Sequence, residues 1–102
     1  MIGIIDYGVG NIQAFLNLCK RLQINAKRVV DSEDFDGCSR IILLGVGHFD
    51  HAMQRFNESG LRPILERLVV NDKAPVLGVC VGMQMLADTA EEGVLPGLGW
   101  IP

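Results

Sequence analysis

The sequence lacks several features that mark whole classes of protein. No apolar stretch approaches the ~20 residues that a membrane-spanning helix needs. The apolar opening at residues 2–5 is too short for a secretion signal and has no basic segment before it. The chain has no repeat and no low-complexity segment. We therefore expect a cytoplasmic globular protein that does not bind membranes.

Cysteine and positive charge are also scarce. Three cysteines, Cys19, Cys38 and Cys80, are odd in number and lack CxxC spacing, so they predict neither a disulfide framework nor a zinc site. Free thiols of this kind fit a reducing compartment. Nine Lys and Arg against twelve Asp and Glu give a net charge of −3. This balance does not indicate a nucleic-acid partner.

The chain does have enough apolar sequence for one small domain with a core, since 49% of its 102 residues are hydrophobic. Four short apolar runs, at 2–5, 26–30, 40–44 and 76–79, are rich in β-branched residues and nearly continuous. Strands that are buried on both faces of a parallel sheet have this pattern.

Helical periodicity separates these runs. Apolar stripes of α-helical spacing lie at 12–22 and 61–69, and a further helix is expected at about 50–59, with Gly60 as its stop and Pro63 in the first turn of the next helix. The connection from 30 to 40 has room for a single helical turn. The alternation predicts a doubly wound α/β fold with a flavodoxin-like parallel sheet.

Cys80 is the most informative residue, because it forms a Gly-x-Cys-x-Gly pattern with Gly78 and Gly82 between a predicted strand and a predicted helix. A nucleophile on such a turn has a strained backbone, and the two glycines remove side chains that would clash. A nearby helix N-terminus favours the thiolate. A buried cysteine at a strand end is the alternative interpretation. The flanking strand and helix favour the nucleophile.

A second pair of glycines follows the third predicted strand. Gly45, Val46 and Gly47 would lie at the same carboxyl edge of the sheet as Cys80, where open parallel sheets bind ligands. Their N–H groups would form part of an oxyanion hole, with the N–H of Val81 as the second donor. Alone, the two glycines indicate only a tight turn with positive φ. Their pairing with the Cys80 turn favours the catalytic role.

The glycines after the first strand, Gly8 and Gly10, look like the start of a dinucleotide-binding loop. Gln13 stands where that motif has its third glycine, and Asp31 is the only candidate for its acidic residue. So incomplete a motif does not predict a dinucleotide cofactor. No cofactor and no metal are predicted for this chain.

Four stretches together resemble the class I (triad-type) glutamine amidotransferases. More narrowly, the chain is similar to the glutaminase subunits of imidazole glycerol phosphate synthase. The stretches are Asp6-Tyr7-Gly8-Val9-Gly10-Asn11, Gly45-Val46-Gly47-His48-Phe49, residues 78–84 and residues 91–99. The resemblance covers residues 1–102 but only the first half of the family's length. It therefore implies the N-terminal half of a single, truncated domain.

The resemblance implies a chemistry for these positions. Cys80 would attack the side-chain amide of glutamine and form a thioester, which water resolves after ammonia has left. Gln84 and Glu92 match positions that hold the glutamine. The alternatives are a solvent-facing helix residue for Gln84 and a solvated surface charge for Glu92.

The resemblance also implies a partner. In the family, ammonia passes to a cyclase subunit of (β/α)₈-barrel type and is used in histidine biosynthesis. The loop expected to face that subunit contains Tyr7, Gly8, Gly10 and Asn11.

The chain departs from the family pattern at two positions beside the oxyanion loop. Leu44 replaces a proline that stiffens this strand in the family, so we expect a more mobile loop. His48 replaces a small residue. Similar His-Phe-Asp variants occur in a sister group that amidates surface-polysaccharide sugars, which is the alternative pathway.

The resemblance implies that the family's catalytic His and Glu come from a segment well downstream of the Cys80 turn, whereas this sequence ends at Pro102. His51 is expected on a helix surface, and His48 is a poor substitute base. The chain alone is therefore expected to be inactive. An uncovered sheet edge and apolar face would promote self-association. A non-catalytic partner-binding module and a flavodoxin-like binder with a phosphate at residues 8–11 remain competing hypotheses.

Overall fold

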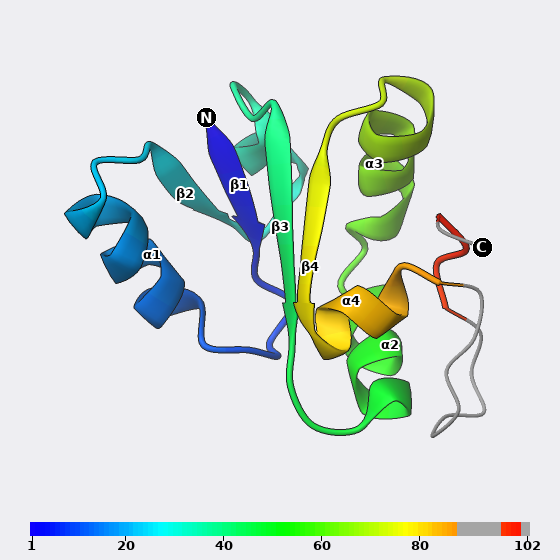
Figure 1. The fold of residues 1–102 in the computed structure, drawn as a ribbon. Helices are drawn as coiled ribbons and strands as arrows, with labels where there is room; N and C mark the ends of the chain where they lie inside the picture. Colours follow the sequence, from blue (N-terminus) through cyan, green and yellow to red (C-terminus); the bar gives the residue numbers. More distant parts are fainter. Residues whose placement is uncertain (88–96, 101–102) are drawn as a thin grey trace.

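The computed structural model describes residues 1–87 and 97–100. Each strand in this part of the chain is followed by a helix or a helical turn, and α2, α3 and η2 follow one another between the last two strands (Figure 1). In order they are β1 (Ile2–Ile5), α1 (Ile12–Arg21), β2 (Ala26–Val29), the 3-10 turn η1 (Ser32–Phe35), β3 (Arg40–Gly45), α2 (Phe49–Glu58), α3 (Arg62–Glu66), the π-helical turn η2 (Arg67–Asn71), β4 (Val76–Cys80) and α4 (Val81–Met85).

The four strands form one parallel sheet in the order β2-β1-β3-β4. Helices lie on both of its faces (Figure 1). One core layer forms where α1 packs on β1 and β3, through Ile4, Ile12, Cys19 and Leu44. The larger layer includes Ile5 and Leu43 of the sheet with Phe49, Met53 and Phe56 of α2. The predicted doubly wound, flavodoxin-like architecture is confirmed.

The prediction that every strand is buried on both faces is wrong for β4. This strand lies at the edge of the described sheet, and none of its residues is fully buried. Leu77 is 58% exposed. Most contacts of α1 are with β2 and β1, at the opposite side of the sheet from β4. The sheet therefore has an open apolar area on its α1 side.

Several element boundaries differ from the prediction; β4, for example, runs through Cys80 rather than ending at residue 79. β2 ends at Val29 rather than Val30, because the N–H of Val30 donates to the Asp34 carboxylate of η1 instead, at 2.8 Å. β3 runs one residue further than predicted, through Gly45, because its pairing with β4 continues to that position. The apolar stripe at 61–69 changes to π-helical spacing after Glu66.

Tyr7, the only tyrosine of the chain, lies in the larger core layer with 5% of its surface exposed. Its ring meets the Phe56 ring edge to face at 5.5 Å, a favoured aromatic geometry. Its hydroxyl donates a hydrogen bond to the Leu44 carbonyl. Burial raises the pKa of Tyr7 well above the ordinary value of 10.0.

Tyr7 should therefore not ionise until the chain unfolds. An unfolded tyrosine loses its proton above about pH 10, whereas folded Tyr7 keeps it. The free energy of unfolding should thus fall as the pH rises above about 10, by up to ~1.4 kcal/mol per pH unit from this residue. Tyrosinate absorbance should rise together with the loss of circular dichroism. A Tyr7→Phe variant should lack this share of the pH dependence. Tyrosinate forming near pH 10 in a chain that is still folded would contradict the expectation.

Candidate active site

The strand-to-helix turn predicted at Cys80 is present in the structure. Cys80 ends β4 and directly precedes α4, with φ 57° and ψ −125°. Such backbone angles are unfavourable for any residue with a Cβ, at about 1–3 kcal/mol. The side chain is exposed, so the alternative interpretation as a buried core cysteine is wrong. The thiol is available to a reagent from solution.

Close packing explains both glycines around Cys80. A Cβ on Gly78 would lie 2.6 Å from the Cα of Met83, and one on Gly82 would lie 2.1 Å from the Leu43 carbonyl oxygen. Separations this short are sterically forbidden, so any larger residue would push α4 away from the sheet. The glycines allow the helix to begin immediately after the strand.

The segment at 45–47 lies beside the Cys80 turn. Gly45 is the register partner of Cys80 in the β3–β4 pair, and a Cβ on it would lie 2.8 Å from the Gly82 nitrogen. Gly47 has φ +82°, a conformation that favours glycine. In Figure 1 the carboxyl ends of β3 and β4 meet next to α4. This edge brings Cys80 together with Gly45 and with Val81 at the start of α4. Val46 and Gly47 follow Gly45 in the chain, and the donor role of all four residues stays a prediction.

Of the two residues expected to hold glutamine, the structure describes only Gln84. Gln84 lies on α4 with an exposed side chain. Glu92 lies outside the described residues. The end of its motif does return to the site region, since the N–H of Leu98 donates to the Met85 carbonyl at 2.8 Å. The segment at 97–99 is thus attached to the carboxyl end of α4.

The two histidines occupy α2 and its cap. The Nδ1 atom of His48 accepts a hydrogen bond from the Asp50 N–H at 3.1 Å and caps the helix. Neutral His48 therefore carries its proton on Nε2, and its one lone pair is already used. His48 is accordingly not arranged to accept the proton of Cys80. His51 is exposed on α2, as the sequence predicts.

The loop expected to face a partner divides into buried and exposed residues. Gly8 and Asn11 are exposed, whereas Tyr7 is buried and does not fit a partner-facing role. Asn11 caps α1 by accepting a hydrogen bond from the Ala14 N–H at 3.2 Å. A Cβ on Gly10 would lie 3.0 Å from the Cβ of Leu44. The loop therefore packs onto the end of β3.

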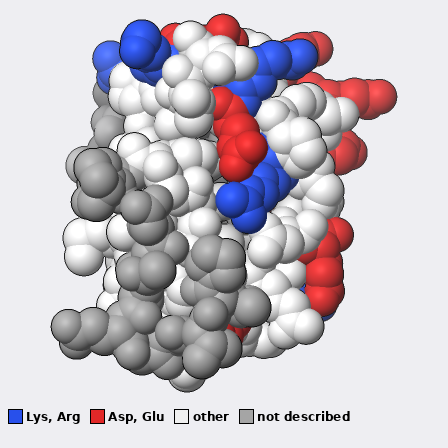
Figure 2. All heavy atoms as spheres, turned by 90° about the vertical axis from the view of Figure 1, so that its right-hand side faces the viewer, with Lys and Arg blue, Asp and Glu red and all other residues white. Residues whose placement is uncertain are grey.

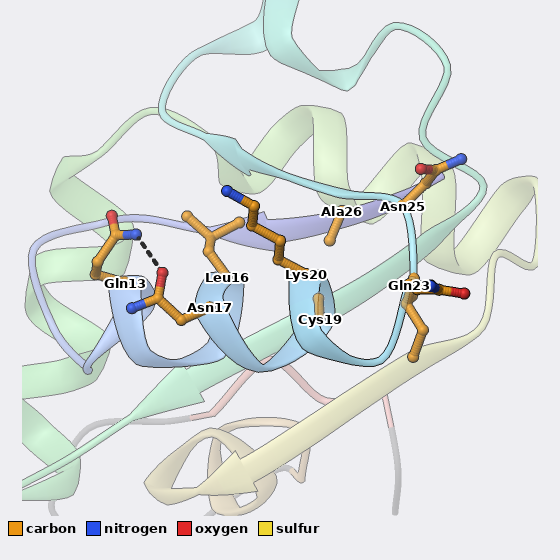
Figure 3. Close-up of a pocket in the computed structure, with 9 residues that line it drawn as sticks. Gln13, Leu16, Asn17, Cys19, Lys20, Gln23, Asn25 and Ala26 are labelled. Carbon is orange, nitrogen blue, oxygen red and sulfur yellow. Dashed lines mark hydrogen bonds between the residues drawn. The ribbon is translucent and has the colours of Figure 1, made fainter.

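Two of the hollows in the described surface adjoin the ends of β2 and lie apart from the Cys80 turn. One, of about 520 Å³, is lined by α1 and the turn before β2; its side chains include Gln13 and Asn17, joined by a hydrogen bond of 3.0 Å (Figure 3). The other, of about 380 Å³, is bordered by Tyr7, Gly8 and Arg55. Neither hollow contains Cys80 or the residues at 45–47.

Charge and metal-ligand patterns do not indicate a second kind of site in the described part of the chain. On the face beyond α3, acidic and basic side chains are interspersed (Figure 2). Arg62 and Glu66 of α3 form an ion pair at 2.9 Å. Among residues 1–87 and 97–100, no three His, Cys, Asp or Glu side chains are grouped to hold a metal ion. No helix in those ranges has the length and apolar character to cross a membrane.

Comparison with known proteins identifies a matching family model and several sequence relatives. The family model described as glutamine amidotransferase class-I matches residues 4–98. Imidazole glycerol phosphate synthase subunit HisH of Bdellovibrio bacteriovorus is 64% identical over 102 residues, which are 100% of this chain and 50% of that protein. The same subunit of Leptospira borgpetersenii is 52% identical over 101 residues, which are 99% of this chain and 50% of that protein.

A solved structure agrees with these sequence relatives. A chain described as a crystal structure of glutamine amidotransferase superimposes with a TM-score of 0.72 and 26% identity. The match covers 96% of this chain and 51% of that one. The chain therefore spans about half the length of the curated relatives that it matches.

The backbone strain at Cys80 can be tested with a pair of substitutions. Cys80→Gly should be more stable than Cys80→Ala by about 1–2 kcal/mol, because both remove the sulfur but only glycine adopts these backbone angles without strain. At Leu77, in the same strand, the order should reverse, and the Ala variant should be the more stable by ~0.5–1 kcal/mol. Denaturant titration measures both differences. Equal stability of the two Cys80 variants would show that the turn is relaxed in solution.

Proposed function

The chain belongs to the glutamine amidotransferase class-I family, and we propose that it is the nucleophile-bearing half of a glutaminase. The observation that carries this proposal is the exposed Cys80 thiol on a strained turn, in register with Gly45 of the neighbouring strand. Strained backbone angles persist only where the surrounding structure holds them, and they cluster at active sites and ligand-binding sites.

The proposed reaction proceeds in two steps. The Cys80 thiolate adds to the side-chain amide carbon of glutamine and forms a C–S bond, and the carbonyl oxygen becomes an oxyanion. The C–N bond then breaks, and nitrogen takes up a proton and leaves as ammonia. Water adds to the resulting thioester, the C–S bond breaks, and glutamate and the free thiol are released.

The oxyanion of these steps would be held by amide groups at the carboxyl edge of the sheet. The donors are the N–H of Val81 and those of residues 45–47. In other acyl-transfer enzymes one such donor contributes about 2.7–4 kcal/mol to the transition state. Gln84 on α4 and Glu92 would hold the substrate, and the Glu92 carboxylate would pair with its α-ammonium group.

The chain would form the N-terminal half of one domain at residues 1–102. We propose that the general base and its orienting carboxylate belong to the remaining half of the family's length. A thiol without that base loses most of its activation, so the 102-residue chain alone should hydrolyse glutamine very slowly or not at all. The remaining half of the family's length would also cover the open α1-side face of β4.

The names of the relatives suggest where the ammonia goes. HisH proteins are subunits of imidazole glycerol phosphate synthase. We propose that the ammonia passes to a cyclase subunit of (β/α)₈-barrel type in histidine biosynthesis, in the cytoplasm. Gly8, Gly10 and Asn11 would face that subunit, while Tyr7 supports them from below.

Covalent labelling tests the glutaminase proposal on the chain as it is. A diazoketone analogue of glutamine should modify Cys80 in preference to buried Cys19 and half-buried Cys38, as mass spectrometry of the peptides would report. An excess of glutamine should protect Cys80 from the label. The same concentration of glutamate, which lacks the side-chain amide, should protect it less. Cys80→Ser is the matched control and should abolish the protected label. Labelling of Cys80 that glutamine does not slow would contradict the proposal.

The open face of β4 should make this chain self-associate at high concentration. Exposed apolar area beside an unpaired strand edge favours contact between copies, and Leu77 is 58% exposed there. We expect Leu77→Lys to shift sedimentation toward the monomer. Val70, 53% exposed on η2, supplies the control, and Val70→Lys should leave the association unchanged. An equal effect of the two substitutions would show that the β4 face is not the contact.

A further inference from the structure

We propose that Tyr7 is a positioning residue for the reaction proposed above. Its phenol holds the end of β3 against α4 and thereby keeps the amide groups of residues 45–47 in place beside Cys80. The inference rests on the proposed function, because those amide groups matter to catalysis only if the thiol attacks an amide carbonyl. It concerns a residue whose side chain is buried, so Tyr7 acts through β3 rather than on the reacting atoms.

The Tyr7 hydroxyl contacts β3 where its pairing with β1 has ended. Pairing between β1 and β3 ends at Ile4 and Ile42, whereas β3 continues to Gly45. The Leu44 carbonyl oxygen lies beyond the paired residues and accepts the hydrogen bond from Tyr7. Beyond Ile42, β1 no longer pairs with β3, and the Tyr7 phenol contacts β3 in its place.

The same hydroxyl oxygen reaches α4, which begins at the Cys80 turn. It lies 3.4 Å from the Met85 sulfur, and a Cβ on Gly45 would lie 3.1 Å from it. A phenol has a single proton, and the Leu44 carbonyl is a better acceptor than a thioether, so the Met85 contact is one of packing. The end of β3, the start of α4 and Tyr7 therefore meet around Gly45.

The ring of Tyr7 is held from the α2 side. Its edge-to-face contact with Phe56 has an interplanar angle of 86°, and both side chains are buried. A phenol fixed in this way has little freedom to turn from the Leu44 carbonyl. Burial also raises the pKa of Tyr7, so ionisation does not remove the hydrogen bond near neutral pH.

The test compares two electrophiles on the full 102-residue chain. Tyr7→Phe keeps the ring and removes only the hydroxyl. Ile12→Val, at the first residue of α1 and in the other core layer, controls for a general loss of stability. The diazoketone glutamine analogue presents a carbonyl to the oxyanion donors, whereas iodoacetamide alkylates any accessible thiol by simple displacement. We expect Tyr7→Phe to slow labelling of Cys80 by the analogue about tenfold, with iodoacetamide unaffected and Ile12→Val slowing neither.

Amide hydrogen exchange provides a readout that does not depend on glutamine chemistry. Tyr7→Phe should speed exchange at Gly45 and its neighbours, and Ile12→Val should not. The proposal is overturned if exchange at 45–47 is unchanged in Tyr7→Phe, or if both variants slow both electrophiles alike. Absence of glutamine-protected labelling in the unsubstituted chain would refute the glutaminase proposal, while faster exchange at 45–47 would still support the positional role of Tyr7.

Discussion

The close approach of α4 to β3 at Gly82 is the constraint on which the site depends. The backbone of the helix lies against the Leu43 carbonyl with no room for a Cβ between them. Because the helix begins so close to the sheet, only one residue, Cys80, is available to turn the chain from β4 into α4. Cys80 makes this turn with a positive φ. The close approach also places the amide nitrogens of the first turn of α4 beside Gly45. The strained turn at Cys80 and its closeness to Gly45 thus both follow from one contact between backbones.

Much of this arrangement could be predicted from the sequence, because it depends on local patterns of apolar residues and glycines. Runs of β-branched residues with intervening 3.6-residue stripes are sufficient for a parallel sheet with helices on both faces. The glycines at 78 and 82 mark a place where a side chain would clash, and the structure contains those clashes. Parallel strands bring their carboxyl ends to one edge, so the proximity of the 45–47 segment to Cys80 followed from topology alone.

The features that the sequence did not predict depend on tertiary contacts. Tyr7 lies in a glycine-bearing loop, and only the positions of Phe56 and Leu44 show that it is buried. The cap at His48 is an exception, because it is a local contact with the residue two positions on. Histidine is not among the usual N-cap residues, so the sequence does not indicate it. An apolar run such as that of β4 is the same in a central and an edge strand, so the exposure of Leu77 depends on what covers it. The signal that could have identified Tyr7 is an aromatic residue two positions after the end of a buried strand.

The loop from Asp6 to Asn11 is anchored at both ends. Its start is held to β2, because the Asp6 N–H donates to the Val29 carbonyl at 2.8 Å, and its end is the cap of α1. A molecule that docks there meets a surface with its backbone already ordered, so little conformational entropy is lost on contact. A partner would then dock on this loop as on a rigid body, and the fit of the two surfaces would matter more than folding of the loop on binding.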